Sequence, residues 1–323
     1  MKLKKTPRKT NQKTLAKKSV QIVEVGLRDG LQNEKAVLST TDRIELARRL
    51  VEAGSRRMEL GAFVRSDWVP QMAGSKEVID GVLSLVKQKK IVSRTEFSAL
   101  VPNARGMMLA LETDIQEVAV FGAASETFSK KNINCTIDES LKKFAQVLKV
   151  AKQKKIKVRG YLSCCFGCPF EGAIDEKKVV QLAQTLLKMG CYEISIGDTI
   201  GIAHPGQVRS LFGKLKRVIP IKKLAGHFHD TRGTALVNIL TAYEMGVRVF
   251  DSSLGGLGGC PYAPGSAGNV STEEVVFMFE GMGVKTGLDL EVLIDINHWM
   301  SGIMKKELTS RLSKAGLPVA GPL

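Results

Sequence analysis

Two histidines, His227 and His229, lie two residues apart in the short apolar segment 224–230. Side chains two apart on a strand point to the same side, so two imidazoles would leave the end of one strand together. Each neutral ring offers one nitrogen, and the backbone fixes their separation, which suits a divalent metal ion. The alternative is a pair of structural histidines, so the interpretation depends on finding a carboxylate and a dry pocket elsewhere.

Other residues could complete such a site. Asp29 would add an anionic oxygen, and Asn269 an amide oxygen if its side chain turns inward; alternatively, Asn269 caps the helix that begins near Ser271. A mixed nitrogen and oxygen set with open positions suits Mg²⁺ or Mn²⁺, and Zn²⁺ or Co²⁺ stay open. Arg28 would place a permanent cation beside the metal, where it could stabilise an oxyanion or enolate, unless it only pairs with Asp29 or Glu59.

Proton carriers are also present. Glu59 and Asp198 could move protons or orient the metal-bound histidines, and the second role is favoured. Cys260 lies in a segment with six glycines between residues 255 and 268, and such a loop can close over a site and deliver a thiol. No Lys-Ser/Thr pair follows these glycines, which disfavours a phosphate-cradling loop. A single Cys-x-x-Cys at 165–168 favours buried thiols over a zinc or redox site.

Regular elements must position these residues. Hydrophobic patterning predicts strands at 20–26, 56–61, 95–101, 117–122, 157–164, 192–198, 224–230 and 249–254. It predicts helices at 42–53, 75–88, 103–112, 138–153, 175–189, 205–217, 234–245 and 272–282, the first capped by Thr41 or Asp42. Eight strand–helix units predict a closed (β/α)₈ barrel, the TIM barrel, and not an open doubly wound sheet. Polar residues should then gather at the carboxyl ends of the strands and not in their middles.

Composition divides the 323-residue chain into three parts. The formal charge is +16, but eight Lys and Arg residues precede the first acid, Glu24. We expect residues 1–19 to form a disordered basic arm, 20–287 a catalytic barrel, and 288–323 a helical extension that packs across the barrel or contacts another subunit. No apolar run reaches the roughly 20 residues that span a bilayer, so no membrane partner is expected. Six cysteines without an export signal favour the reducing cytoplasm.

Several segments together resemble the 3-hydroxy-3-methylglutaryl-CoA (HMG-CoA) lyases, metal-dependent barrels of the aldolase type. The resemblance extends from about Val20 to Gly287. The segments that carry it are 24–35, 68–72, 121–126, 130–135, 197–201, 227–231 and 258–262, together with Phe63. The cysteine loop distinguishes the lyases from relatives that share only the Arg-Asp and His-x-His elements.

The resemblance implies retro-Claisen cleavage of HMG-CoA to acetoacetate and acetyl-CoA. We expect Mg²⁺ or Mn²⁺ as the metal, and a homodimer. The implied metal ligands are Asp29, His227, His229 and Asn269. The implied catalytic residues are Cys260, Arg28, Glu59, Asp198 and His227, with Cys260 protonating the enolate. The implied contacts to the acyl-CoA substrate are Arg28, Gln32, Lys35, Lys131 and Asn132, with Lys130 and Lys131 near the CoA phosphates.

The sequence departs from the family pattern at three places. Leu27 stands where the family usually has proline, Ala62 where hydroxyl residues are common, and Arg232 where tyrosine is usual. The last two bear on the preferred acyl substituent. Two other hypotheses remain at this point. One is another aldolase-type enzyme, such as a Claisen synthase acting on 2-oxo acids. The other is a non-catalytic binder of nucleic acid or another polyanion through the basic arm.

Overall fold

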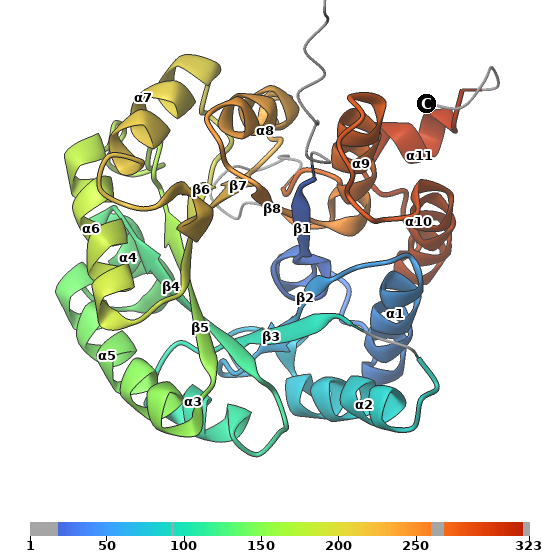
Figure 1. Ribbon diagram of the computed structural model, residues 1–323. Helices are drawn as coiled ribbons and strands as arrows, with labels where there is room; N and C mark the ends of the chain where they lie inside the picture. The colour runs from blue at the N-terminus through green and yellow to red at the C-terminus, as the bar shows by residue number, and fades with distance from the viewer. Residues whose placement is uncertain (1–18, 92–93, 260–267, 319–323) are drawn as a thin grey trace, which may run out of the picture.

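The computed structural model describes residues 19–91, 94–259 and 268–318. Eight parallel strands follow one another around a closed barrel, and β1 pairs with β8 to complete it (Figure 1). The strands are β1 (Gln21–Glu24), β2 (Arg57–Ala62), β3 (Glu96–Leu100), β4 (Glu117–Ala123), β5 (Lys157–Ser163), β6 (Glu193–Asp198), β7 (Leu224–Phe228) and β8 (Val249–Ser252). The predicted TIM barrel is confirmed.

Helices surround the barrel (Figure 1). They are α1 (Thr40–Glu52), α2 (Ser75–Lys87), α3 (Ala104–Ala110), α4 (Glu126–Ile133), α5 (Ile137–Lys154), α6 (Glu176–Met189), α7 (Pro205–Leu215), α8 (Ala235–Glu244), α9 (Thr272–Gly281), α10 (Leu290–Met304) and α11 (Arg311–Ala315). Single turns are η1 (Gly26–Gly30), η2 (Pro70–Met72), η3 (Ile221–Lys223) and η4 (Leu254–Gly256). All eight predicted barrel helices are present, while α4 and η1 were not predicted.

The start of α1 corrects one prediction. The N-cap is Ser39, whose hydroxyl accepts a hydrogen bond from the Asp42 backbone N–H at 3.1 Å, and not Thr41 or Asp42. The predicted apolar side is confirmed, because Leu46, Leu50 and the residues beside them are buried against the barrel. This helical spacing fixes which face of α1 packs on the strands, and hence how β1 and β2 are held side by side.

The barrel interior corrects a second prediction. Polar residues do not lie only at the carboxyl ends of the strands. Arg57, Arg159, Glu193 and Asp251 are inside strands and buried. Arg159 donates hydrogen bonds to Glu193 and Asp251, so these charges compensate one another within the barrel.

The C-terminal extension packs beside the first and last barrel helices and not across the barrel. Helix α10 contacts α1 and α9, and α11 contacts α9 and α10 (Figure 1). Beyond α10, Thr309 donates its backbone N–H to the Gly255 carbonyl at 3.0 Å, next to the glycine-rich segment. Within the described ranges, no helix combines the length and apolar character that crossing a bilayer requires. The first 18 residues lie outside those ranges, so the basic arm stays a prediction.

Candidate metal-binding site

The turn η1 places Arg28 and Asp29 directly after β1. Glu24, the last residue of β1, accepts hydrogen bonds from the backbone N–H groups of Gly26 at 2.8 Å and Leu254 at 3.0 Å. A Cβ atom on Gly26 would lie 2.6 Å from the Glu24 carboxylate, so only glycine fits there without a shift. Glu24 thus joins the ends of β1 and β8 and holds the turn that carries Arg28 and Asp29.

Three of the predicted metal ligands converge. The Nε2 atoms of His227 and His229 lie 3.1 Å apart, and Oδ2 of Asp29 lies 3.8 Å from the first and 3.9 Å from the second. His227 lies in β7, and His229 is the first residue after that strand. Residues two apart on a strand point to the same side, so the two imidazoles lie as predicted. One carboxylate oxygen and two imidazole nitrogens therefore surround a single point.

The protonation states of this group suit a cation. Burial alone would raise the pKa of the Asp29 carboxyl, but Arg28 and the two imidazoles lower it to about 2. Burial, with help from His227, lowers the pKa of His229 to about 4. At neutral pH, Asp29 is thus ionised and His229 is neutral. Both are in the form that binds a metal ion.

The distances among Asp29, His227 and His229 fit a divalent ion bound between them. The two Nε2 atoms, 3.1 Å apart, and Oδ2 of Asp29 can each offer a lone pair to one ion when both rings carry their hydrogen on Nδ1. The Nδ1 atom of His229 is buried without a hydrogen-bond partner in the described part of the chain. A ring held by a metal through Nε2 commonly carries its hydrogen on Nδ1, so the residues present are compatible with such an ion.

Arg28 is fixed beside this group. Its Nε donates to Glu59 Oε2 at 2.5 Å, and its Nη1 donates to Asp29 Oδ1 at 2.6 Å. Its guanidinium carbon also lies 5.3 Å from the centre of the Tyr161 ring. Both ion pairs weighed as alternatives for Arg28 are therefore present, and they aim its remaining N–H groups from a fixed position.

Asn269 reaches the site through its amide nitrogen. Its Nδ2 donates to Asp29 Oδ2 at 2.9 Å and to the Leu257 carbonyl at 3.3 Å. Ser271, and not Asn269, is the N-cap of α9. Binding a metal through oxygen would require the Asn269 amide to rotate, so its role as a ligand stays a prediction.

The glycines near Asn269 allow two backbone segments to approach each other closely. A Cβ on Gly268 would lie 2.4 Å from the Gly258 carbonyl carbon, so the two ends of the glycine-rich segment touch through their backbones. Gly255, Gly256 and Gly258 have positive φ angles, which a side chain would disfavour. Cys260 lies outside the described residues, so its predicted role stays a prediction.

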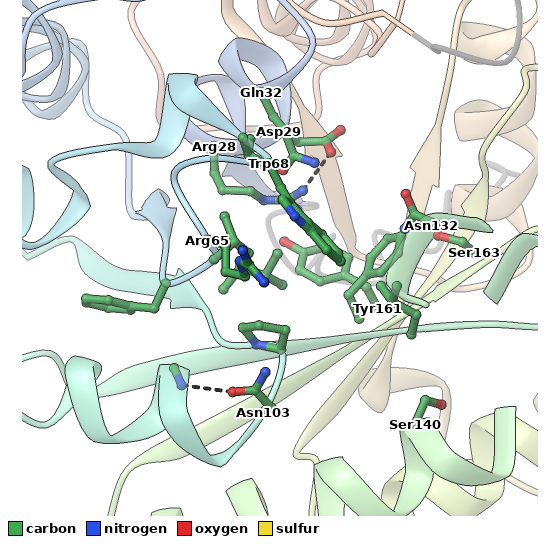
Figure 2. A pocket seen from close by; sticks show the side chains of 18 of the residues that line it. Arg28, Asp29, Gln32, Arg65, Trp68, Asn103, Asn132, Ser140, Tyr161 and Ser163 are labelled. Carbon is green, nitrogen blue, oxygen red and sulfur yellow. Dashed lines mark hydrogen bonds and ion pairs between the residues drawn. The ribbon is translucent and has the colours of Figure 1, made fainter. Parts of the chain in front are cut away.

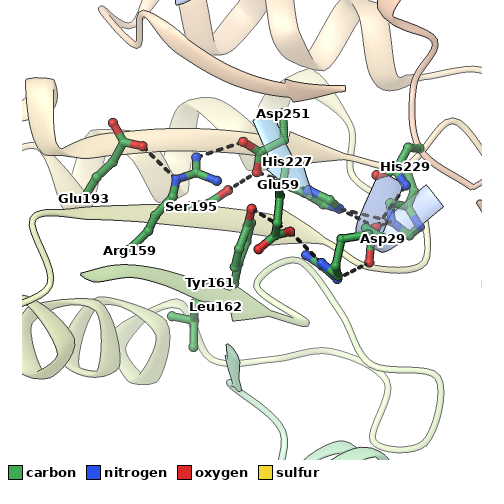
Figure 3. A network of polar contacts seen from close by, with 12 residues as sticks. Asp29, Glu59, Arg159, Tyr161, Leu162, Glu193, Ser195, His227, His229 and Asp251 are labelled. Atoms are coloured by element: carbon green, nitrogen blue, oxygen red, sulfur yellow. Dashed lines mark hydrogen bonds and ion pairs between the residues drawn. The ribbon is translucent and has the colours of Figure 1, made fainter. Parts of the chain in front are cut away.

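Four side chains near the site were missed from the sequence. Ser195 and Asp251 lie on the Nδ1 side of His227 (Figure 3), and the guanidinium carbons of Arg28 and Arg159 lie 5.3 and 4.8 Å from the centre of the Tyr161 ring. Arg159 and Tyr161 stand two apart in β5, with the same inward parity as the histidines in β7. Listing the polar residues at the inward-facing alternate positions of every predicted strand could have identified these side chains.

A cavity of about 800 Å³ opens beside the metal-binding group. Figure 2 shows Arg28, Asp29, Trp68, Asn132 and Tyr161 around it. Of the predicted substrate contacts, Arg28, Gln32 and Asn132 line the cavity. Lys35 and Lys131 do not line it, and the Lys131 Nζ lies 4.9 Å from the centre of the Phe170 ring.

Cationic side chains other than the predicted lysines face this cavity. Arg65, Arg105 and Lys143 line it, in addition to Arg28. Arg65 pairs with Asp67 at 2.5 Å, whereas Arg105 and Lys143 have no ion pair among the described residues. They are therefore better placed than Lys131 to meet an anionic ligand inside the cavity.

Several predicted positions lie next to the site but not on the cavity wall. The Asp198 carboxylate accepts hydrogen bonds from the backbone N–H groups of Ile202 and Ala203 at 3.1 and 3.0 Å. Burial raises the pKa of Asp198 and of Glu59, although hydrogen bonds and nearby cations oppose the change. Ala62 and Arg232 do not line the cavity either, so the structure gives neither a direct contact with an acyl group there.

The cysteines at 164, 165 and 168 are buried free thiols, as expected. Burial raises the pKa of Cys164 and Cys165, which keeps both protonated and unreactive at neutral pH.

Comparison with known proteins places the chain among lyases. Residues 19–300 match the family described as HMGL-like. The 3-hydroxy-3-isohexenylglutaryl-CoA/hydroxy-methylglutaryl-CoA lyase of Pseudomonas aeruginosa is 47% identical and covers 94% of this chain and 99% of its own. The cytoplasmic 3-hydroxy-3-methylglutaryl-CoA lyase of Rattus norvegicus is 46% identical over 92% of this chain and 84% of its own. The mitochondrial hydroxymethylglutaryl-CoA lyase of Bos taurus is 46% identical, over 92% and 90%.

Solved structures agree with these relatives. The hydroxymethylglutaryl-CoA lyase of Pseudomonas aeruginosa superposes with a TM-score of 0.88 at 47% identity, covering 92% of this chain and 97% of that one. An HMG-CoA lyase from Acinetobacter baumannii, in complex with coenzyme A and 3-methylmalate, superposes with a TM-score of 0.87 at 36% identity, covering 94% and 98%. Both the barrel and the sequence match extend over nearly the whole chain. The chain therefore belongs to the HMGL-like family of TIM-barrel enzymes.

Proposed function

We propose that this enzyme is an HMG-CoA lyase, which cleaves 3-hydroxy-3-methylglutaryl-CoA to acetoacetate and acetyl-CoA. The observation that carries the proposal is the convergence of Asp29, His227 and His229 on one point at a cavity, within the HMGL-like fold. Relatives that are 46–47% identical, and that align over 90–99% of their own length, are named as lyases of this kind.

Asp29, His227 and His229 would hold a divalent cation, with Mg²⁺ or Mn²⁺ as the proposed ion and Asn269 as a further ligand. Such an ion, when bound, polarises substrate oxygens and acidifies the tertiary hydroxyl group of HMG-CoA. The donors leave positions open for those oxygens, because the described side chains supply one carboxylate and two imidazoles.

Arg28 would stabilise the charge that develops when the carbon–carbon bond breaks. The bond electrons move into the acetyl thioester, where negative charge gathers on the carbonyl oxygen of the enolate. Arg28 lines the cavity, and Glu59 and Asp29 hold its guanidinium in place. A fixed cation needs no reorganisation during the reaction, which is the property that makes such groups effective.

Protons must leave the hydroxyl group and reach the enolate carbon. The family resemblance names His227 or a water near Asp29 for the first transfer. A His227 ring that holds the ion through Nε2 and carries its hydrogen on Nδ1 has no free lone pair, so we assign this transfer to the water and the second to the Cys260 thiol. Glu59 would act by holding Arg28, and Asp198 by holding the chain at residues 202–203. Substituting Cys260 with alanine should remove turnover, and undiminished turnover would contradict this assignment.

The acyl-CoA would enter through the 800 Å³ cavity. Gln32 and Asn132 line it and could bind polar groups of the substrate. Lys35 and Lys131 do not line it and stay predicted contacts. Arg105 and Lys143 would meet CoA phosphates. One relative's structure holds coenzyme A and 3-methylmalate, which supports a CoA ligand here.

A second substrate is favoured by the walls of the cavity. Apolar side chains line much of it, including Phe63, Leu100, Leu109, Phe128 and Phe144. An apolar wall suits a hydrocarbon substituent on carbon 3, and one relative is named for an isohexenyl substrate as well as the methyl one. We therefore propose that longer 3-alkyl homologues are also cleaved. Comparing kcat/KM for the methyl and isohexenyl thioesters tests this, and turnover of the methyl compound alone would contradict it.

The deciding experiment uses chelated enzyme reloaded with Mg²⁺, Mn²⁺, Zn²⁺ or Co²⁺ and supplied with HMG-CoA. Equal amounts of acetoacetate and acetyl-CoA are expected with Mg²⁺ or Mn²⁺, and none with the Asp29→Asn variant. Absence of acetoacetate with every metal would contradict the proposal. Condensation of acetyl-CoA with a 2-oxo acid would instead identify a Claisen synthase.

The basic arm, the cytoplasmic location and the homodimer stay predictions. Relatives are named both cytoplasmic and mitochondrial, so their names do not choose between the two locations. Deleting residues 1–18 should leave turnover unchanged, because every predicted site residue lies between Arg28 and Asn269 in the sequence. Steeply salt-dependent binding to nucleic acid that is lost with the arm would show an additional role for it. Analytical ultracentrifugation would report the oligomeric state.

A further inference from the structure

A chain of buried polar contacts runs through the barrel interior to His227 (Figure 3). Arg159 donates from Nε to Glu193 Oε1 and from Nη2 to Asp251 Oδ1, both at 2.8 Å. Arg159 and Asp251 are each only 1% exposed. Water cannot replace these contacts, so Asp251 keeps one orientation.

The other oxygen of Asp251 faces the histidine. Oδ2 accepts a hydrogen bond from the Ser195 hydroxyl at 2.6 Å and lies 3.2 Å from His227 Nδ1. Arg159, a buried permanent cation, pairs with the opposite oxygen at 2.8 Å, so Asp251 is an ionised carboxylate. An ionised carboxylate only accepts hydrogen bonds, so His227 Nδ1 must donate. The neutral ring then has no hydrogen on Nε2.

His229 differs in this respect. Its Nδ1 is buried without a hydrogen-bond partner in the ranges that the structure describes, so no neighbour there fixes its tautomer. Its Nε2 lies 3.1 Å from His227 Nε2. In the metal-free protein, a lone pair on His227 Nε2 accepts a hydrogen bond from the Nε2–H of His229. To bind a metal through Nε2, His229 must then carry its hydrogen on Nδ1 instead. The tautomer of His227 is thus fixed by its neighbour, whereas the tautomer of His229 changes when a metal binds.

We propose that Asp251, held by Arg159, is a positioning residue that fixes His227 in the Nδ1–H tautomer and so presents its Nε2 lone pair to the metal. The inference rests on the proposed function for the metal itself. Asp251 touches neither the cavity nor the ion-facing nitrogens, so its effect passes through His227. Carboxylates behind metal-binding imidazoles commonly act in this way.

The variant Asp251→Asn changes the tautomer while keeping the shape. Arg159 needs an acceptor, so it holds the amide oxygen on its own side and leaves the NH₂ group facing His227. The ring must then accept at Nδ1 and carry its hydrogen on Nε2. We expect Mn²⁺ affinity, measured by titration calorimetry, to fall about 10- to 100-fold. In ¹⁵N NMR of the metal-free variant, the hydrogen of His227 should move from Nδ1 to Nε2.

Ser195→Ala is the matched control. It removes one donor to the same Asp251 oxygen but leaves the carboxylate, so the tautomer should persist and Mn²⁺ affinity should change less than about threefold. If Mn²⁺ affinity fell as much in Ser195→Ala as in Asp251→Asn, the inference would be overturned. Such a result would show that any polar substitution in the barrel interior weakens metal binding. An unchanged Mn²⁺ affinity in Asp251→Asn would overturn it too.

The wild-type protein supplies a test that does not depend on the metal affinity of any variant. Its four histidines give resolvable ring ¹⁵N signals, and His227 can be assigned by its loss in His227→Gln. A hydrogen on Nε2 of wild-type His227 would overturn the inference directly. Failure of the wild-type protein to bind Mn²⁺, with His227 found as the Nδ1–H tautomer, would instead contradict the metal centre of the proposed function.

Discussion

At the scale of single residues, the same side-chain type has different chemistry at neighbouring positions. His227 is backed by a carboxylate, while His229 has burial and a second imidazole around it. Burial disfavours the charged form of His229, and a nearby imidazolium would disfavour it further. The contrast is invisible in the sequence, where both appear as one His-x-His pattern, because it depends on which strand lies behind each ring.

His229 predicts a pH dependence of stability in the metal-free protein. Its pKa falls from 6.5 to about 4 on folding, so between these values the unfolded chain binds a proton that the folded chain does not. Through this group, the free energy of unfolding should fall as pH drops from 6.5 to 4, by on the order of 3 kcal/mol. Urea unfolding across this range should show a shallower loss in His229→Gln than in wild type. Equal slopes would contradict the prediction.

The cations that line the cavity allow a second test. Lys143 lines it, whereas Lys131 lies over Phe170 and does not. Lys143→Ala should raise the KM for HMG-CoA about 3- to 10-fold, the effect of losing roughly 1 kcal/mol of contact with a CoA phosphate, with kcat little changed. Lys131→Ala is the matched control and should change KM less. The reverse order would favour the lysine that the family resemblance indicated.

At the scale of elements, local patterns determine where helices and strands form but not every detail of their ends. The start of α1 is an example, because three consecutive candidate caps, Ser39, Thr40 and Thr41, precede its apolar face. The structure selects Ser39, whose extended backbone lets its hydroxyl reach the Asp42 N–H. Propensity alone ranks serine and threonine too closely to decide.

This choice predicts unequal effects of two similar substitutions. Ser39→Ala removes the acceptor for an otherwise unpaired N–H group and should cost about 1 kcal/mol in the free energy of unfolding. Thr41→Ala, inside the first turn, should have a smaller effect, because Thr41 makes no capping bond. Chemical denaturation of the two variants side by side measures the difference, and a larger loss for Thr41→Ala would restore the sequence-based assignment.

The barrel itself could be predicted from sequence because each strand and helix repeats a strong local period. Helix α4 could not, since only Phe128 and Ser129 of its eight residues are buried, which leaves little periodic signal. Asp29 and the two histidines were predicted as one site, and their distances bring them together. Asp251 was missed because a polar residue within a strand has a clear role only once its partners, Arg159 and Ser195, are known from the fold.

At the scale of the whole molecule, the candidate metal site joins distant parts of the chain. Asp29 follows the first strand, His227 lies in the seventh, and His229 comes directly after the seventh. They meet only because the barrel is closed by the pairing of β1 with β8. A ligand that binds only the folded state stabilises it by mass action. Metal binding should therefore oppose opening of the barrel as a whole.

Thermal unfolding tests this coupling. At 100 times the dissociation constant, Mn²⁺ should add about 2.7 kcal/mol to the free energy of unfolding and raise Tm by a few degrees. A chelator should reverse the increase. In Asp29→Asn the metal-dependent increase should be absent or much reduced, whatever the variant's own Tm. An equal increase in this variant would place the ion elsewhere.

The pairing of β1 with β8 also sets an order of events during biosynthesis. The ribosome makes Asp29 early, but the imidazoles emerge about 200 residues later, and the strand that closes the ring comes later still. A nascent chain stalled before β8 therefore carries all three donors without the architecture that gathers them. The three donors can therefore gather around one ion only after β8 has been made and has joined β1.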